Sequence, residues 1–99
     1  MLLSGRNALI TGSGRNIGAA IARAFAAEGA NIVVNVRASL AEGEAVVKEV
    51  RAGGRKCILI VADVTDSQQV AKMSKRAADE IGPIDILVNS VGIAPMAAR

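Results

Sequence analysis

The sequence predicts a single α/β domain over residues 1–99, built on a doubly wound parallel sheet. Short apolar runs alternate with segments whose apolar residues recur at helical spacing, the pattern of parallel strands joined by crossover helices. A glycine-rich stretch, Thr11–Gly18, lies between the first apolar run and the first helical segment. Hydrophobic residues make up 52% of the chain and only 1% is aromatic, so we expect an aliphatic core.

The first half of the chain reads as strand, glycine turn, helix and strand. Arg6–Thr11 is the first expected strand, and the helix after the turn runs to about Glu28. Gly29 suits the left-handed cap that ends many helices. The second strand is Asn31–Val36, whose continuous apolar centre is typical of a parallel strand covered on both faces.

Capping boxes and glycines bound the next two helices. Ser39–Glu42 has the pattern that begins a helix, and Asp66–Gln69 repeats it. The first of these helices ends at Gly53-Gly54 and the second at Gly82-Pro83, which stops it.

Two more strands complete the predicted sheet, Lys56–Val61 and Ile84–Val88. In a doubly wound dinucleotide fold the strand order begins 3-2-1-4, so it reverses between the first and fourth strands. Ligands bind in the crevice outside the carboxyl ends of those two strands. Here the two ends carry the glycine stretch and Asn89–Gly92, which makes them the predicted ligand site.

The glycine stretch has the composition of a phosphate-binding loop. Glycines let the backbone approach a pyrophosphate closely, and a following helix offers free N–H groups and the positive end of its dipole. The spacing is one residue longer than Gly-x-Gly-x-x-Gly, and no Gly-Lys-Ser/Thr follows. The alternative is a glycine turn without a ligand. The candidate contacts in this loop are Gly12, Ser13, Gly14, Arg15, Asn16, Ile17 and Gly18.

The same loop resembles the Thr-Gly-x-x-x-Gly-x-Gly loop of the short-chain dehydrogenase/reductase family. Thr11, Gly12 and Gly18 match this pattern, and Asn16 stands where the family has its middle glycine. Asparagine is among the residues that best tolerate a left-handed backbone, so we expect the turn to be kept.

Three further segments carry the resemblance. Asn89-Ser90-Val91-Gly92 is similar to the family's Asn-Asn-Ala-Gly, which implies that this segment lies along the cofactor and that Asn89 braces the sheet. Asp63-Val64 resembles the family's aspartate at the adenine ring, although a turn carboxylate explains Asp63 equally well. Gly82–Asn89 is similar to the family's lead into the fourth strand. Together these segments imply a Rossmann-type fold over essentially the whole chain.

Charge at the end of the second strand favours NADP over NAD. NAD sites usually place an acidic residue there to bond the ribose hydroxyls, whereas this chain has Asn35-Val36-Arg37. A guanidinium pairs with a 2′-phosphate that a carboxylate would repel. Arg15 is a second candidate cation, and Ser13 or Asn35 could add a polar contact. The alternative for each arginine is a solvated surface residue.

No catalytic residue is identified in this sequence. The family's chemistry uses a Tyr-x-x-x-Lys pair and a serine beyond the fourth strand, and this chain contains no tyrosine. The resemblance therefore implies the cofactor-binding, N-terminal portion of a longer reductase. By overall likeness that reductase is of the oxoacyl-carrier-protein-reductase-like type, acts on a carbonyl or alcohol substrate and forms a homo-oligomer.

Two other interpretations of the chain stay open. It could be a non-catalytic dinucleotide-binding module, or a subunit that a partner chain completes. Another Rossmann-like protein, such as a methyltransferase, would normally have an acidic residue at the end of the second strand. The presence of Arg37 there argues against this class of protein.

Composition excludes several other classes. The net charge of +3 is scattered and lacks interleaved aromatics, so we expect no nucleic-acid partner. No apolar run approaches the length of a membrane span, and we expect a soluble cytoplasmic protein without a membrane partner. With no histidine and a single cysteine, Cys57, the usual zinc sites and histidine triads are excluded. Cys57 lies in an apolar run and is expected to be buried and inert.

Overall fold

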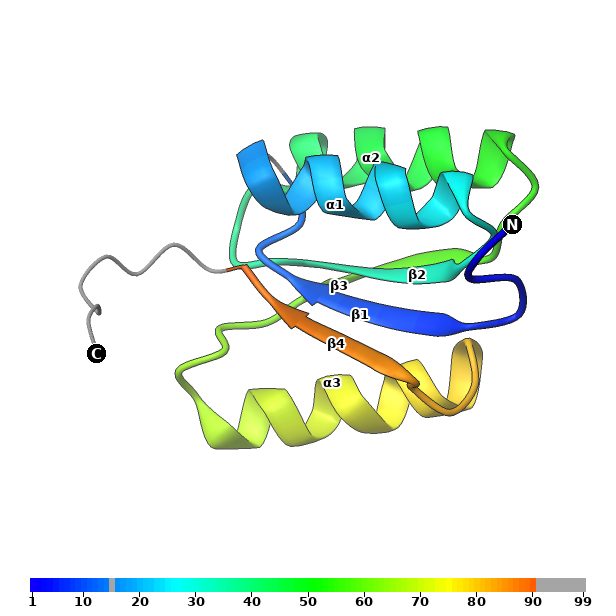
Figure 1. The fold of residues 1–99 in the computed structure, drawn as a ribbon. Helices are drawn as coiled ribbons and strands as arrows, with labels where there is room; N and C mark the ends of the chain where they lie inside the picture. Colours follow the sequence, from blue (N-terminus) through cyan, green and yellow to red (C-terminus); the bar gives the residue numbers. More distant parts are fainter. Residues whose placement is uncertain (15, 91–99) are drawn as a thin grey trace, which may run out of the picture.

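The computed structural model describes residues 1–14 and 16–90 of the chain. Strands and helices alternate along it, and the strands form a parallel sheet of order β3-β2-β1-β4 (Figure 1). This confirms the predicted fold class and strand order. The elements are β1 (Asn7–Thr11), α1 (Asn16–Ala27), β2 (Asn31–Val36), α2 (Leu40–Ala52), β3 (Cys57–Val61), α3 (Ser67–Glu80) and β4 (Ile86–Asn89).

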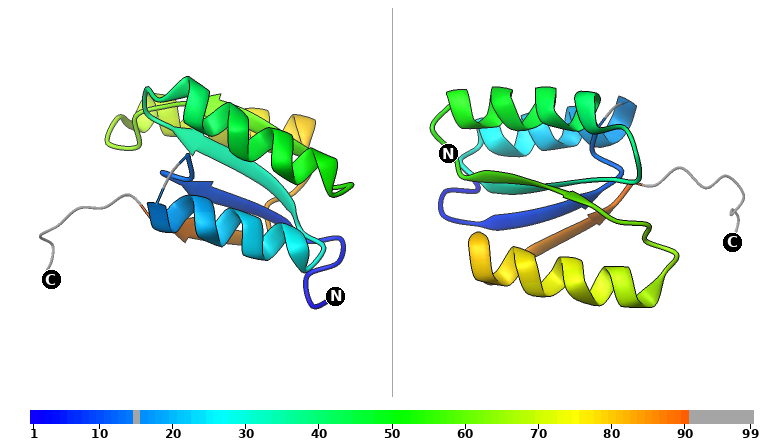
Figure 2. Two further views of the ribbon diagram at one scale, coloured as in Figure 1. Left: turned by 90° about the horizontal axis from the view of Figure 1, so that it is seen from above. Right: turned by 180° about the vertical axis from the view of Figure 1, so that it is seen from behind.

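Helices cover both faces of the sheet. The pair α1 and α2 lies on one face and α3 on the other, as the views from above and behind show (Figure 2). Alternate residues of β2 supply the two aliphatic cores. Val34 packs with the α1–α2 layer and Val33 with the α3 layer, and each is 0% exposed. The strand is therefore buried on both faces, as its continuous apolar run predicted.

The helix ends confirm the predicted N-cap at Asp66 and contradict the one at Ser39, and the Gln69 side chain accepts from the Asp63 N–H (2.8 Å) where a capping box would have the Asp66 N–H. Asp66 accepts hydrogen bonds from the backbone N–H groups of Gln68 (2.9 Å) and Gln69 (3.3 Å), which satisfies two free donors of α3. Ser39 makes no such side-chain bond, so the predicted box at α2 is wrong. Its backbone lies at φ −80° and ψ 73°, outside the extended region that N-cap residues usually take. Gly29, with φ +99°, has the predicted left-handed conformation after α1.

The fourth strand starts two residues later than predicted and forms an edge of the sheet. Asp85, just before it, joins β1: its N–H donates to the Asn7 carbonyl (2.9 Å), and its carboxylate accepts from the Asn7 N–H (2.9 Å). Ile84 packs instead against the α3-side core. Within β4 itself Leu87 is 68% exposed. In the described sheet β4 pairs with β1 alone, so its other side is an open edge that carries an exposed leucine.

Cys57 lies at the start of β3 and is buried in the α1–α2 core, as predicted. Burial raises the pKa of its thiol from 9.0 to about 12. The thiol is therefore neutral at physiological pH and has little nucleophilic character.

Candidate functional site

A cleft of about 690 Å³ opens at the carboxyl end of the sheet. Its volume lies within the range of roughly 300–1,000 Å³ that is typical of ligand pockets. The glycine loop and the start of α1 form one wall, the turns after β2 and β3 form another, and a residue after β4 closes it. The lining residues are Gly12, Gly14, Asn16, Ile17, Gly18, Asn35, Val36, Arg37, Ala38, Ser39, Ala62, Asp63, Val64, Thr65 and Ser90.

Two residues of the glycine loop take left-handed backbone conformations. Gly12 has φ +61°, and Asn16 has φ +55°. Asn16 is the only non-glycine with a positive φ among the residues described here, at the position where the family pattern has glycine. The expectation that asparagine keeps this turn is therefore confirmed.

The first turn of α1 packs closely against the glycine loop at Gly18. A Cβ added there would lie 2.6 Å from the Ser90 hydroxyl oxygen and 2.9 Å from the Gly12 carbonyl carbon. At Gly18 no residue but glycine fits without a shift of the backbone. A Cβ at Gly14 would come within 2.5 Å of a Val36 methyl, so there the Val36 side chain would have to move. The unpaired N–H groups of the first helical turn are thereby held beside the cleft, where they suit a phosphate.

Ser13 and Asn35 hold the loop from behind. Ser13 is 0% exposed, and its hydroxyl donates to the Ile10 carbonyl (2.6 Å) and accepts from the Asn35 N–H (3.0 Å). The Asn35 side chain accepts from the Gly12 N–H (3.2 Å). Both side chains were candidate cofactor contacts, and the Ser13 hydroxyl could donate to a cofactor only by giving up its bond to the Ile10 carbonyl. Asn35 itself lines the cleft.

The ends of β1 and β4 are joined through Thr11. Its hydroxyl donates to the Asn89 side-chain oxygen (3.1 Å) and accepts from the Ser90 N–H (3.1 Å). The Ser90 hydroxyl in turn bonds the Thr11 carbonyl. Ser90 thus reaches the cleft, while Asn89 braces the two strands where the strand order reverses. Three other predicted contacts, Arg15, Val91 and Gly92, lie outside the described residues.

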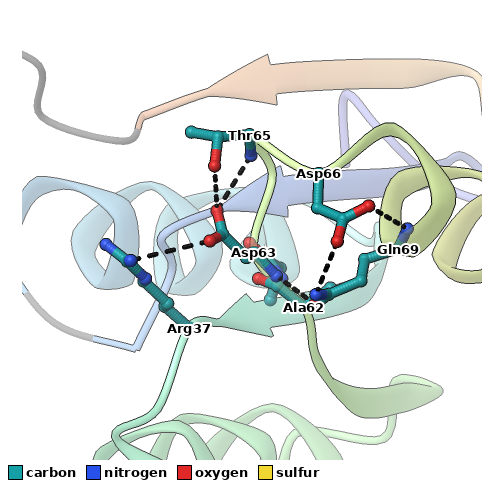
Figure 3. A network of polar contacts seen from close by, with 7 residues as sticks. Arg37, Ala62, Asp63, Thr65, Asp66 and Gln69 are labelled. Atoms are coloured by element: carbon teal, nitrogen blue, oxygen red, sulfur yellow. Dashed lines mark hydrogen bonds and ion pairs between the residues drawn. The ribbon is translucent and has the colours of Figure 1, made fainter.

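At the opposite wall, Arg37 reaches toward Asp63 (Figure 3). The Arg37 Nη2 atom lies 3.6 Å from Asp63 Oδ2, and the Arg37 side chain is 80% exposed. The other Asp63 oxygen accepts from the Thr65 hydroxyl (2.6 Å) and N–H (2.9 Å). These two hydrogen bonds, with a smaller effect of Arg37, lower the pKa of Asp63. The carboxylate is therefore charged at neutral pH, and the exposed guanidinium beside it is accessible to another anion.

Five residues of the cleft were absent from the sequence prediction. Thr65 had a readable signal, since an Asp-x-Thr spacing commonly forms a turn in which the aspartate accepts from the residue two positions on. The other four lie at or just after strand ends, and of these only Ser39 belonged to a motif, as a predicted helix cap. They are Val36, Ala38, Ser39 and Ala62.

The fold and the cleft together define a dinucleotide-binding Rossmann domain. The chain belongs to the short chain dehydrogenase family, whose family model matches residues 6–99.

Known proteins similar to this chain include reductases and a cofactor complex. Versicolorin reductase 1 of Dothistroma septosporum is 47% identical over 91 residues, which are 92% of this chain and 35% of that protein. The 3-oxoacyl-(acyl-carrier-protein) reductase FabG of Staphylococcus aureus is 42% identical over 88 residues, 89% of this chain and 36% of that protein. A short chain dehydrogenase from Burkholderia cenocepacia in complex with NADP superposes with a TM-score of 0.90 at 43% identity, covering 94% of this chain and 38% of that chain. This chain therefore spans little more than a third of each of these proteins.

Residues 1–14 and 16–90 contain neither a metal-binding cluster nor a membrane-spanning helix. No cluster of three or more histidine, cysteine or acidic side chains is arranged to hold a metal ion in this range. None of the helices in the same range has the length and apolar content needed to cross a membrane.

Proposed function

We propose that this chain is the NADP(H)-binding portion of a short-chain dehydrogenase/reductase that transfers hydride between the nicotinamide and a carbonyl or alcohol substrate. One observation carries the proposal. The glycine loop packs against the start of α1 at one wall of the cleft. Arg37 lines the same cleft after β2, at the position where NAD-binding proteins of this fold usually have a carboxylate.

The residues of the cleft suit the parts of this cofactor. The glycines of the loop allow the pyrophosphate to approach the backbone closely, and the free N–H groups and positive dipole end of α1 favour its charge. Arg37 pairs with the 2′-phosphate, and Asp63 with Val64 borders the adenine. Ser90 borders the rest of the cofactor. When bound, the nicotinamide ring supplies or accepts the hydride.

The similar proteins support both the cofactor and the substrate class. The Burkholderia cenocepacia structure is described as a complex with NADP. The Staphylococcus aureus protein is named as a reductase of 3-oxoacyl groups on acyl carrier protein, which are carbonyl compounds. We extend the carbonyl class to this chain and leave the particular substrate open.

Charge reversal at Arg37 tests the cofactor preference. NADPH and NADH are titrated calorimetrically into the wild-type chain, the Arg37→Asp variant and a Lys48→Asp control, which makes the same charge change at an exposed position of α2. A charge-assisted hydrogen bond contributes about 1.5–3 kcal/mol, so we expect Arg37→Asp to weaken the binding of NADPH roughly 10- to 100-fold. NADH affinity should hold or improve, and the control should bind as wild type. Equal wild-type affinities that Arg37→Asp leaves unmoved would contradict the proposal.

A further inference from the structure

We propose that Asn35 is a positioning residue that holds the phosphate loop and the adenine wall of the cleft in fixed relation. This inference rests on the proposed function and concerns the same cleft. The side chain is 1% exposed and contacts the ends of two other strands at once. It lies at the penultimate position of β2, between the loop after β1 and the turn after β3.

Three hydrogen bonds connect the Asn35 amide to both sides. Its Oδ1 accepts from the Gly12 N–H at 3.2 Å, on the loop side. Its Nδ2 lies 3.3 Å from the Ile60 carbonyl and 3.2 Å from the Ala62 carbonyl and donates to both. Ala62 immediately precedes Asp63, so the same amide sets where the adenine wall begins.

A second layer of bonds ties the Asn35 backbone to Ser13. The Ser13 N–H donates to the Asn35 carbonyl (2.9 Å), and the Asn35 N–H donates to the Ser13 hydroxyl (3.0 Å). The loop is thus fixed to β2 by one bond to the Asn35 side chain and two bonds to the Asn35 backbone. The groups of Asn35 and Ser13 are buried and Gly12 is partly buried, so a lost partner inside this network would leave a costly unpaired donor or acceptor.

The chemistry of the position requires an amide. Asparagine presents an acceptor at one corner and two donors at the other, which match one N–H and two carbonyls. An aspartate would set a second oxygen against the carbonyls of Ile60 and Ala62. Alanine would leave all three partners without the side chain. Either change removes the side-chain link between Gly12 and the Ala62–Asp63 turn, while the backbone bonds of β2 to Ser13 and Ala62 remain.

Asn35 and Arg37 should therefore differ in their effect on cofactor choice. The pyrophosphate and adenine are common to NADPH and NADH, and these are the parts that the Asn35 contacts align. Loss of the Asn35 side chain should weaken the binding of NADPH and of NADH by the same factor, which leaves the ratio of the two affinities unchanged. Loss of Arg37 should change the ratio.

The test compares Asn35→Ala and Ser13→Ala with Val33→Ala. Val33 is buried on the same face of β2 but lies in the α3-side core, away from the loop, so its variant controls for a general loss of stability. Amide hydrogen exchange at Gly12 is measured by NMR in the cofactor-free chain, relative to Leu9 in the middle of β1. Dissociation constants for NADPH and NADH are measured calorimetrically on the same samples.

We expect Asn35→Ala to speed exchange at Gly12 relative to Leu9 about tenfold and to raise both dissociation constants about tenfold, as the loss of a buried hydrogen bond implies. Val33→Ala should change neither the Gly12-to-Leu9 ratio nor the affinities to that extent. If Asn35→Ala does not fold, Ser13→Ala must give the faster Gly12 exchange. Unchanged Gly12 protection, or equal losses of affinity in Val33→Ala, would overturn the inference. If the wild type binds neither cofactor, the proposed function fails, and the exchange data alone decide the role of Asn35.

Discussion

Replacing Gly18 with alanine adds one methyl group where α1 meets the glycine loop. That carbon would stand 2.6 Å from the Ser90 hydroxyl oxygen and 2.9 Å from the Gly12 carbonyl carbon. The Ser90 side chain can rotate away at the cost of its bond to the Thr11 carbonyl, but the Gly12 backbone has no such freedom. The start of α1 must therefore move away from the loop.

Two opposing effects set the size of the loss. Alanine in a helix interior is favoured over glycine by about 0.8–1 kcal/mol. Overpacking of a filled interior costs about 1–3 kcal/mol, and here the obstacle is backbone. We therefore expect Gly18→Ala to be destabilised by up to ~2 kcal/mol. A helix start displaced from the loop no longer aims its N–H groups at the pyrophosphate, so NADPH affinity should fall at least about tenfold, or 1.4 kcal/mol.

Gly53→Ala is the matched control for this change. A Cβ there meets only the Val50 carbonyl oxygen at 3.5 Å and the Glu49 carbonyl oxygen at 4.0 Å, which are ordinary contacts. Thermal melts and calorimetric NADPH titrations of both variants are compared with wild type. The control should melt and bind as wild type does. A Gly18→Ala chain that melts higher than wild type and keeps its NADPH affinity would refute the close packing of loop and helix.

Three further outcomes are expected. Asn16→Gly should bind NADPH as tightly as wild type or more tightly in calorimetry, because glycine adopts φ +55° readily; loss of binding would mean that the asparagine makes a contact with the cofactor. Asp66→Ala should lower the melting temperature at pH 7, because α3 loses its cap, whereas Asp79→Ala, at an exposed ion pair, should not. The Gln69 and Gln68 bonds lower the pKa of Asp66, so its contribution is present above the unfolded-state pKa and is lost as the pH falls; unequal melting of wild type and Asp66→Ala at pH 2 would contradict this. Residues 1–99 expressed alone should self-associate in sedimentation runs through the open β4 edge, less so with Leu87→Lys, and should not reduce simple ketones; a stable wild-type monomer with turnover would show this to be wrong.

Much of the fold was predictable because its signals are local. The apolar run of β2 indicated a strand buried on both faces, and the glycines marked where helices end. The left-handed backbone of Asn16 followed from its place in a glycine pattern. The strand order followed from the fold class, since parallel strands with short crossovers allow few arrangements.

The parts that could not be predicted depend on contacts between distant residues. Ser39 has the right sequence for a cap, but its ψ is set by the turn that carries the chain from β2 into α2. Asn35 was proposed as a contact to the cofactor, and its amide is occupied by Gly12, Ile60 and Ala62 from two other strand ends. The alternation of side chains along β2 says only that Asn35 and Val34 face opposite ways. It does not say which backbone groups come within reach.

The central claim is that NADPH binds in the cleft at the carboxyl end of the sheet. The most direct measurement is an NMR titration of the isotope-labelled chain with NADPH, followed through the backbone amides. The account predicts saturable shifts at Gly12, Gly14, Gly18 and Asp63, with no saturable change at Glu49, which lies in the groove between α1 and α2 at their far ends. Saturable shifts confined to that groove, or none at the glycine loop, would contradict it.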